Sequence, residues 1–195
     1  MVSIQKGLPP ELVSSAAELF LSALADKFVP ILGDGLKATR LIESSIAISS
    51  CFSASEDNIL LGVLAVQTKN QNFLNFSFKE IRTHYGFWGA IVKGVALHIL
   101  QHKTKAKELY VEGAAVVDFA RGKGVGTRLF EELMSFAQTQ DFKRITLEVI
   151  DTNQRALRLY ERLGFTVKKR SKIWPVNKII GWPFNEAILM EQTIG

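Results

Sequence analysis

The feature that most constrains the fold is a glycine-rich run, Arg-Gly-Lys-Gly-Val-Gly-Thr at residues 121–127, which separates two segments of different periodicity. Residues 108–117 are apolar on both faces toward their end, which predicts a buried central strand. After the glycines, one apolar stripe recurs at helical spacing and consists of Val125, Leu129, Leu133 and Phe136. A buried strand that turns through glycines into an amphipathic helix is typical of a layered α/β structure.

The flanking patterns extend this unit into an α/β sheet with a parallel core and antiparallel flanks. Strands are predicted over residues 46–54, 59–67, 143–150, 166–173 and 187–193. Helices are predicted from Pro10 to Ala23, over residues 35–45, from Phe87 to Ile99, and from the capping residues at 151–153 to Gly164. Residues 68–85 are polar and aromatic without a clear period, and they receive no assignment.

Composition excludes several classes of protein. The 195 residues include one cysteine, Cys51, so neither a disulfide framework nor a cysteine-rich zinc site is expected. The first residues show no apolar signal-peptide core, and the longest apolar stretch, residues 86–100, is broken by Lys93 and is too short to span a bilayer. We therefore expect a single domain over residues 1–195, in the cytoplasm and without a membrane partner. A net charge of +5 favours an anionic ligand without indicating nucleic acid.

The glycine run has the chemistry of a phosphate cradle. Backbone N–H groups at a helix N-terminus converge on the positive end of the helix dipole, and glycines allow a diphosphate to approach them. Arg121, Lys123 and Arg128 add positive charge. The run departs from the ATP-binding pattern, because Gly124 rather than Ser or Thr follows Lys123, and it also departs from the dinucleotide spacing G-x-G-x-x-G. A tight strand-to-helix turn with solvated basic side chains is the alternative interpretation.

Two motifs carry a resemblance to a known family. Residues 116–126, Val-Val-Asp-Phe-Ala-Arg-Gly-Lys-Gly-Val-Gly, resemble the acetyl-CoA-binding motif R/Q-x-x-G-x-G/A of the GNAT superfamily of N-acetyltransferases. Residues 153–165, Asn-Gln-Arg-Ala-Leu-Arg-Leu-Tyr-Glu-Arg-Leu-Gly-Phe, resemble its second motif, N-x-x-A-x-x-L-Y-x-x-x-G-F. The resemblance covers residues 108–165. It implies a mixed central sheet with helices on both faces, acetyl-CoA as co-substrate without a metal, and a primary amine of a small molecule or a peptide as acceptor.

The same resemblance implies roles for individual residues. Acetyl-CoA binding falls to residues in and near the glycine run: Val116, Val117, Asp118, Arg121, Gly122, Lys123, Gly124, Val125, Gly126, Thr127 and Asn153. Glu148 is implied as the general base, directly or through water, because its Leu-Glu-Val run is similar to that of the branch that acetylates ribosomal-protein N-termini. Tyr160 is implied as the general acid that protonates the departing coenzyme A sulfur. The N–H groups of Val116 and Asp118 would pair with the acetyl carbonyl and the pantetheine arm.

Each of these assignments has a structural alternative. Glu148 could be a strand carboxylate held by a basic neighbour, Tyr160 a packing aromatic, and Asn153 a helix cap alone. For the whole protein, the alternatives are a non-catalytic acyl-CoA-binding sensor on the same fold and a nucleotide-binding enzyme. The formation of a homodimer stays open.

Other features do not fit the two motifs. Residues 68–107 form an insertion before the motif strand that departs from the usual family order. His98 and His102 lie four residues apart on the predicted helix, but no third metal ligand is evident, which favours an ordinary pair at the helix edge. Cys51 is expected to be a buried, inert thiol. A group of aromatic residues near the C-terminus could wall a substrate cleft or cover the core: Trp174, Trp182 and Phe184.

Overall fold

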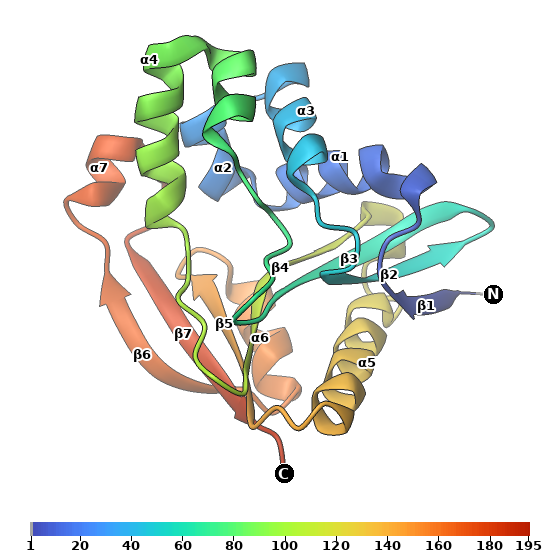
Figure 1. The fold of residues 1–195 in the computed structure, drawn as a ribbon. Coiled ribbons are helices and arrows are strands. Elements are labelled where there is room, and N and C mark those ends of the chain that lie inside the picture. Colours follow the sequence, from blue (N-terminus) through green and yellow to red (C-terminus); the bar gives the residue numbers. More distant parts are fainter. Residues whose placement is uncertain (1) are drawn as a thin grey trace.

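The computed structural model describes residues 2–195, which form a seven-stranded sheet with helices on both faces (Figure 1). The sheet has the strand order β1-β2-β3-β4-β5-β7-β6. The strands are β1 (Ser3–Lys6), β2 (Cys51–Glu56), β3 (Ile59–Gln67), β4 (Glu108–Val116), β5 (Arg144–Ile150), β6 (Thr166–Lys172) and β7 (Glu186–Thr193). The pair β4 and β5 runs parallel, and the other neighbours run antiparallel. The predicted mixed sheet is therefore confirmed, with a parallel core of one strand pair.

The helices divide between the two faces of the sheet (Figure 1). On one face lie α1 (Val13–Ala23), α2 (Ala25–Leu32), α3 (Leu36–Ser45), α4 (Phe78–Ile99) and the short α7 (Val176–Ile180); on the other lie α5 (Val125–Thr139) and α6 (Gln154–Arg162). Each layer has its own apolar core, one around Phe20 and Leu41 and the other around Phe130 and Leu133. Within residues 2–195, every helix falls short of the length and apolar character needed to cross a membrane.

One predicted strand is wrong in its first half. The prediction began at residue 46, but β2 begins at Cys51, and residues 46–50 are a connection. Ile46 forms an isolated bridge with Leu74, and the N–H of Ala47 donates to the carbonyl of Phe73 at 2.8 Å. Backbone hydrogen bonds therefore tie this stretch to the segment before α4 rather than to the sheet. The strand β1 and the helices α2 and α7 had no sequence prediction.

The helix α4 fills much of the segment that had no assignment and contains the predicted helix over 87–99. A capping box starts it: the N–H of Glu80 donates to the Ser77 hydroxyl at 3.2 Å, and the Glu80 carboxylate accepts from the Ser77 N–H at 3.4 Å. At Gly86 the backbone has a φ of 73°, which divides the helix by a kink. The glycine is required there because other residues are strained at such a φ.

The apolar stripe that predicts this helix faces solvent instead of the core. Its side chains have exposed fractions of 39–77%: Phe87, Trp88, Ile91, Val92, Val95 and Ile99. Lys93 instead points inward, where its ammonium donates to the carbonyl of Ile31 and lies 4.6 Å from the centre of the Tyr85 ring. The second half of α4 is therefore apolar on both sides, because Ala90 and Leu97 are buried on its inner side.

Candidate functional site

The site lies where β4 and β5 separate. The two strands are paired from Glu108 opposite Arg144 as far as Val111 opposite Leu147. Beyond that register β4 continues beside β3, and β5 continues beside β7. Because parallel strands that diverge lose their shared hydrogen bonds, the sheet opens between them and leaves backbone groups free for a ligand.

A β-bulge in β4 stands at the start of this opening. On β3, Ala65 faces Gly113 whereas Val66 faces Val111, so Glu112 is the extra residue. A bulge bends its strand and re-aims side chains. Gly113 is needed beside it, because a Cβ there would stand 2.7 Å from Leu24 Cδ1 and 2.8 Å from Phe20 Cζ of α1.

The glycine-loop groove lies on one side of the opening, between the start of α5 and the start of α6, and has a volume of about 470 Å³. Eight of the residues expected to bind acetyl-CoA line it: Val116, Arg121, Gly122, Gly124, Val125, Gly126, Thr127 and Asn153. Gly122 and Gly124 have φ angles of 79° and 82°, and the space where a Cβ would point is open at both. A diphosphate can therefore approach the backbone at the N-terminus of α5.

Three of the expected acetyl-CoA residues do not line this groove: Val117, Asp118 and Lys123. The N–H of Val117 donates to the carbonyl of Leu61 at 3.0 Å, so alternation along the strand turns the N–H of its neighbour Val116 toward the opening. Asp118 forms an ion pair with Arg121 at 2.7 Å. The Arg121 Nε also donates to the Val116 carbonyl at 3.0 Å, so the arginine braces the loop.

The sequence did not single out two arginines that also line the groove, Arg155 and Arg162 of α6. Both lie on the exposed side of that helix, a position that periodicity alone assigns to solvent. They add positive charge opposite the glycine loop, which suits a phosphorylated ligand. Asn153 caps α6 by accepting from the N–H of Ala156 at 3.0 Å, so its side chain already has this structural role.

Tyr160 lies where the groove meets the opening. Its ring is 9% exposed and packs 5.5 Å from the Phe130 ring, and burial raises the pKa of its hydroxyl to about 12. It lines both the glycine-loop groove and a central pocket of about 100 Å³. The tyrosine therefore keeps its proton throughout the neutral range while facing the point at which the two spaces join.

Three carboxylates line the central pocket with Tyr160: Glu148 of β5, Glu112 of the bulge and the exposed Asp26 of α2. Both glutamates also line a third space, the aromatic pocket, of about 250 Å³. Neighbouring spaces thus share lining residues, Tyr160 between the groove and the central pocket and the two glutamates between the central and aromatic pockets. Glu148 is exposed, whereas its neighbours Leu147 and Val149 are buried.

Lys27 of α2 is the cation of this region. It lines the central and aromatic pockets, and burial lowers its pKa, while the opposite charge of Glu148 works against that shift. The Nε1 of Trp182 donates to the Lys27 carbonyl at 3.0 Å, which fixes the backbone at this position. The alternative interpretation of Glu148 is a strand carboxylate held by a basic residue, and Lys27 is such a residue.

Glu112 is the functional candidate that the sequence did not reveal. Burial raises the pKa of its carboxyl group to about 7, although the N–H groups of Phe73 (2.7 Å) and Leu74 (3.3 Å) donate to it and oppose the shift. A group with this pKa exchanges a proton readily at neutral pH. The available signal was one glutamate in an apolar strand; the bulge that turns it into the opening has no sequence signature here.

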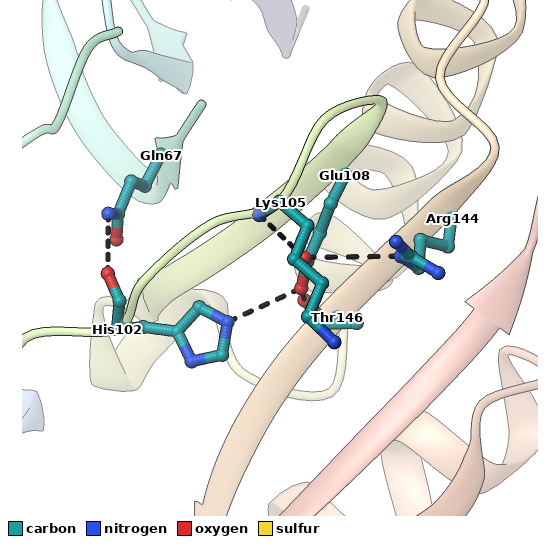
Figure 2. Close-up of polar contacts among 6 residues, drawn as sticks. All are labelled: Gln67, His102, Lys105, Glu108, Arg144 and Thr146. Atoms are coloured by element: carbon teal, nitrogen blue, oxygen red, sulfur yellow. Dashed lines mark hydrogen bonds and ion pairs between the residues drawn. The ribbon is translucent and has the colours of Figure 1, made fainter. Parts of the chain in front are cut away.

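A second buried carboxylate holds the edge of the aromatic pocket (Figure 2). Glu108 accepts from Thr146 Oγ1 at 2.6 Å and from the Lys105 N–H at 2.8 Å, and it lies 3.3 Å from His102 Nε2. Burial alone would raise the pKa of Glu108, but these hydrogen bonds outweigh it and keep that pKa low. The His102 ring stacks on Tyr110 at 4.0 Å between centres, so the network fixes the chain that follows α4.

The other sequence candidates have structural roles. The predicted pair of His98 and His102 is not on one helix, because α4 ends at Ile99. Cys51 is buried, and burial raises the pKa of its thiol to about 12, as expected for an inert cysteine. Among residues 2–195, no three His, Cys, Asp or Glu side chains form a group that could hold a metal.

The comparisons with other sequences agree with this geometry. Residues 38–165 match the acetyltransferase (GNAT) family. A thialysine N-epsilon-acetyltransferase from Mus musculus is 29% identical over 87 residues, which are 44% of this chain and 51% of that protein. A 5-NmdU N-acetyltransferase from Pseudomonas phage PaMx11 is 35% identical over 74 residues, which are 38% of this chain and 51% of that protein. The chain thus spans about half the length of these curated relatives.

Solved structures share the fold. The ribosomal-protein-S18-alanine N-acetyltransferase from Escherichia coli has a TM-score of 0.61 at 16% identity, with 100% of this chain and 95% of that chain covered. Ard1 from Thermoplasma volcanium has a TM-score of 0.63 at 15% identity, with 100% and 98% covered. Because the family match spans well over half of the chain and both motifs, the protein belongs to the GNAT family of acetyltransferases.

Proposed function

We propose that this protein transfers an acetyl group from acetyl-CoA to a primary amine of a small molecule or peptide, by direct attack of the amine on the thioester. The observation that carries the proposal is that the central pocket shares Tyr160 with the glycine-loop groove and shares Glu112 and Glu148 with the aromatic pocket. A binding module that only sensed an acyl-CoA would need the groove but not the second pocket or the carboxylates between them.

The groove supplies binding and polarisation in this proposal. Backbone N–H groups at the start of α5 and the side chains of Arg155 and Arg162 hold the phosphates of acetyl-CoA. The N–H of Val116 donates to the acetyl carbonyl oxygen, where negative charge develops as the amine attacks. Asn153 orients the pantetheine arm from the end of α6.

The acceptor amine must lose a proton, because lysine-like and terminal amines have pKa values of about 10.4 and about 8 in water. We assign this proton to Glu148, directly or through a water molecule, since it faces both pockets and solvent. Glu112 is a second acceptor in the same pocket, with a pKa of about 7. When the C–N bond forms and the C–S bond breaks, Tyr160 donates its proton to the sulfur.

Two assays on the purified protein test the proposal. A thermal shift with acetyl-CoA, larger than with ATP or NAD, is expected if the groove binds an acyl-CoA. Release of free coenzyme A in the presence of a primary amine, with one acetylated product per thiol released, is expected if the protein is an enzyme. Binding of acetyl-CoA without release for a broad amine library would instead support the sensor.

A further inference from the structure

The insertion over residues 68–107 forms one wall of the aromatic pocket. Eight of the twenty-two residues that line this pocket come from it. Phe76 contributes a ring 6.4 Å from that of Phe28, and the neighbouring Phe73 ring lies 5.3 Å from that of Phe20. The C-terminal turn of α4 adds Leu97 to the wall.

Both ends of the insertion are fixed by hydrogen bonds, to the sheet and to the end of α3. At the start, the N–H groups of Phe73 and Leu74 donate to Glu112, and the N–H of Asn75 donates to the Ser45 carbonyl at 2.8 Å. At the end, the Gln67 side chain donates to the His102 carbonyl at 2.8 Å (Figure 2). The wall is therefore a built part of the pocket.

Most residues that line the pocket are aromatic or aliphatic, and four polar side chains lie among them: Gln67, Asn72, Gln101 and His102. Six rings line it: Phe20, Phe28, Phe76, Tyr110, Trp182 and Phe184. The formal charges are those of Glu112, Glu148 and Lys27, so two carboxylates outnumber one lysine. An ammonium group therefore fits beside the carboxylates of the central pocket, and the rest of the acceptor lies among rings.

The size of the pocket limits the acceptor further. Its volume of about 250 Å³ lies below the roughly 300–1,000 Å³ of typical small-molecule sites. A peptide would extend beyond a pocket of this volume, and a second ammonium would lose its hydration among the rings. An amino acid would bring a carboxylate toward Glu112 and Glu148.

We infer that the acceptor is a small primary amine with a compact apolar or aromatic body, and that the insertion over residues 68–107 selects it. This inference rests on the proposed acetyl transfer. It differs from the peptide acceptor that the Leu-Glu-Val run around Glu148 suggested, because it depends on the pocket wall rather than on the strand.

A panel of matched amines tests the inference on the wild-type protein. We expect kcat/KM for 2-phenylethylamine to exceed that for phenylalanine, 1,4-diaminobutane and an alanyl tetrapeptide by at least about tenfold each. Higher kcat/KM for any of the other three would overturn the inference and leave acetyl transfer intact. Absence of turnover with every amine of the panel and of a broad library would overturn both.

A pair of variants locates the selection in the insertion. Phe76→Ala removes a ring from the pocket wall, whereas Phe78→Ala removes a half-exposed ring two residues later, outside the pocket. We expect Phe76→Ala to raise KM for 2-phenylethylamine about tenfold with KM for acetyl-CoA unchanged, and Phe78→Ala to change neither. If Phe76→Ala is unstable, Phe76→Leu is used, with an expected rise of a few fold. An unchanged KM for the amine in a folded variant contradicts the assignment of the wall.

Discussion

The glycine-loop groove and the aromatic pocket lie on either side of the central pocket, which Tyr160 and the two glutamates line, and they offer different chemistry to a ligand. The groove, about 470 Å³, presents glycine backbone and arginine side chains to a ligand whose phosphates are common to all acyl-CoA chemistry. The aromatic pocket, about 250 Å³, presents rings from α1, α2, the insertion and the connection before β7. A site that binds its ligand through backbone N–H groups keeps its function when side chains are exchanged. The shape and polarity of the aromatic pocket, in contrast, change with each side chain that lines it. The difference suggests that the donor is fixed by the fold and the acceptor by the insertion.

The largest effect is expected for Glu148→Gln, which should change catalysis and leave acetyl-CoA binding in the groove nearly unchanged. The variant should lose about two to four powers of ten in kcat, because Gln cannot accept the amine proton, with little change in the Kd of acetyl-CoA. The rate should recover in part at high pH, where the amine deprotonates unaided. Steady-state kinetics from pH 6 to 10 and acetyl-CoA titrations give both numbers; unchanged kcat across this range removes Glu148 from the mechanism.

Tyr160→Phe tests the junction itself. The ring stays packed beside Phe130, so only the proton is lost, and a thiol pKa of about 8.5 makes coenzyme A a fair leaving group. We expect a tenfold to thousandfold lower kcat. An acetyl donor with a more acidic thiol should recover the variant more than the wild type. If both proteins respond equally to the leaving group, Tyr160 is a packing aromatic.

Glu112→Gln tests the pKa of Glu112 in the acceptor pocket through the pH dependence of protein stability. The pKa of Glu112 is about 7 in the fold against 4.5 for the unfolded chain, so the folded state binds its proton more tightly. This group therefore stabilises the fold fully below pH 4.5, and the contribution is lost as the pH rises through 7. The Gln variant cannot titrate, so its free energy of unfolding relative to wild type should rise by about 2–3 kcal/mol between pH 4 and pH 8. Urea unfolding at several pH values measures it; a constant difference would contradict the assigned pKa.

The smallest effect is expected on the donor side. Gly124→Val puts a branched side chain into the groove and should lower acetyl-CoA affinity about tenfold or more, that is at least about 1.4 kcal/mol. Gly181→Val is a matched control, because Gly181 (φ 85°, ψ 24°) and Gly124 (φ 82°, ψ −1°) are both left-handed, and Gly181 lies outside the groove. Both variants carry similar backbone strain. Equal loss of acetyl-CoA affinity in the two would show that strain and not the groove is responsible.

The same contrast explains what could be predicted from the sequence. The groove is local: β4, the glycine turn, α5 and the capped start of α6 follow from periodicity and from residues such as Asn153 whose effect extends over one turn. Its expected residues accordingly came together, except for Val117, Asp118 and Lys123. The aromatic pocket joins residues from Phe20 to Ala187, and the register that places them together depends on tertiary packing.

Two particular failures have the same cause. Glu112 is aimed by a one-residue slip between β3 and β4, and alternation in β4 does not show such a slip. The stripe from Phe87 to Ile99 has the correct helical period, but a period does not say which side of a helix is covered. The sequence therefore revealed that a helix forms there and not that its apolar side faces water.

That outward stripe has a consequence for the protein in solution. Six neighbouring apolar side chains of α4 with exposed fractions of 39–77% form a patch comparable to the roughly 300–600 Å² that is the largest on a typical monomer. Sulfate strengthens the association of apolar surfaces in water. We therefore expect the protein to precipitate at a low ammonium sulfate concentration because of this face. Replacing Trp88, the most exposed of the six, by Lys should raise that concentration measurably while kcat stays unchanged, because Trp88 lies outside all three pockets. We therefore expect the salting-out curve of the protein to respond to the exposed apolar side of α4.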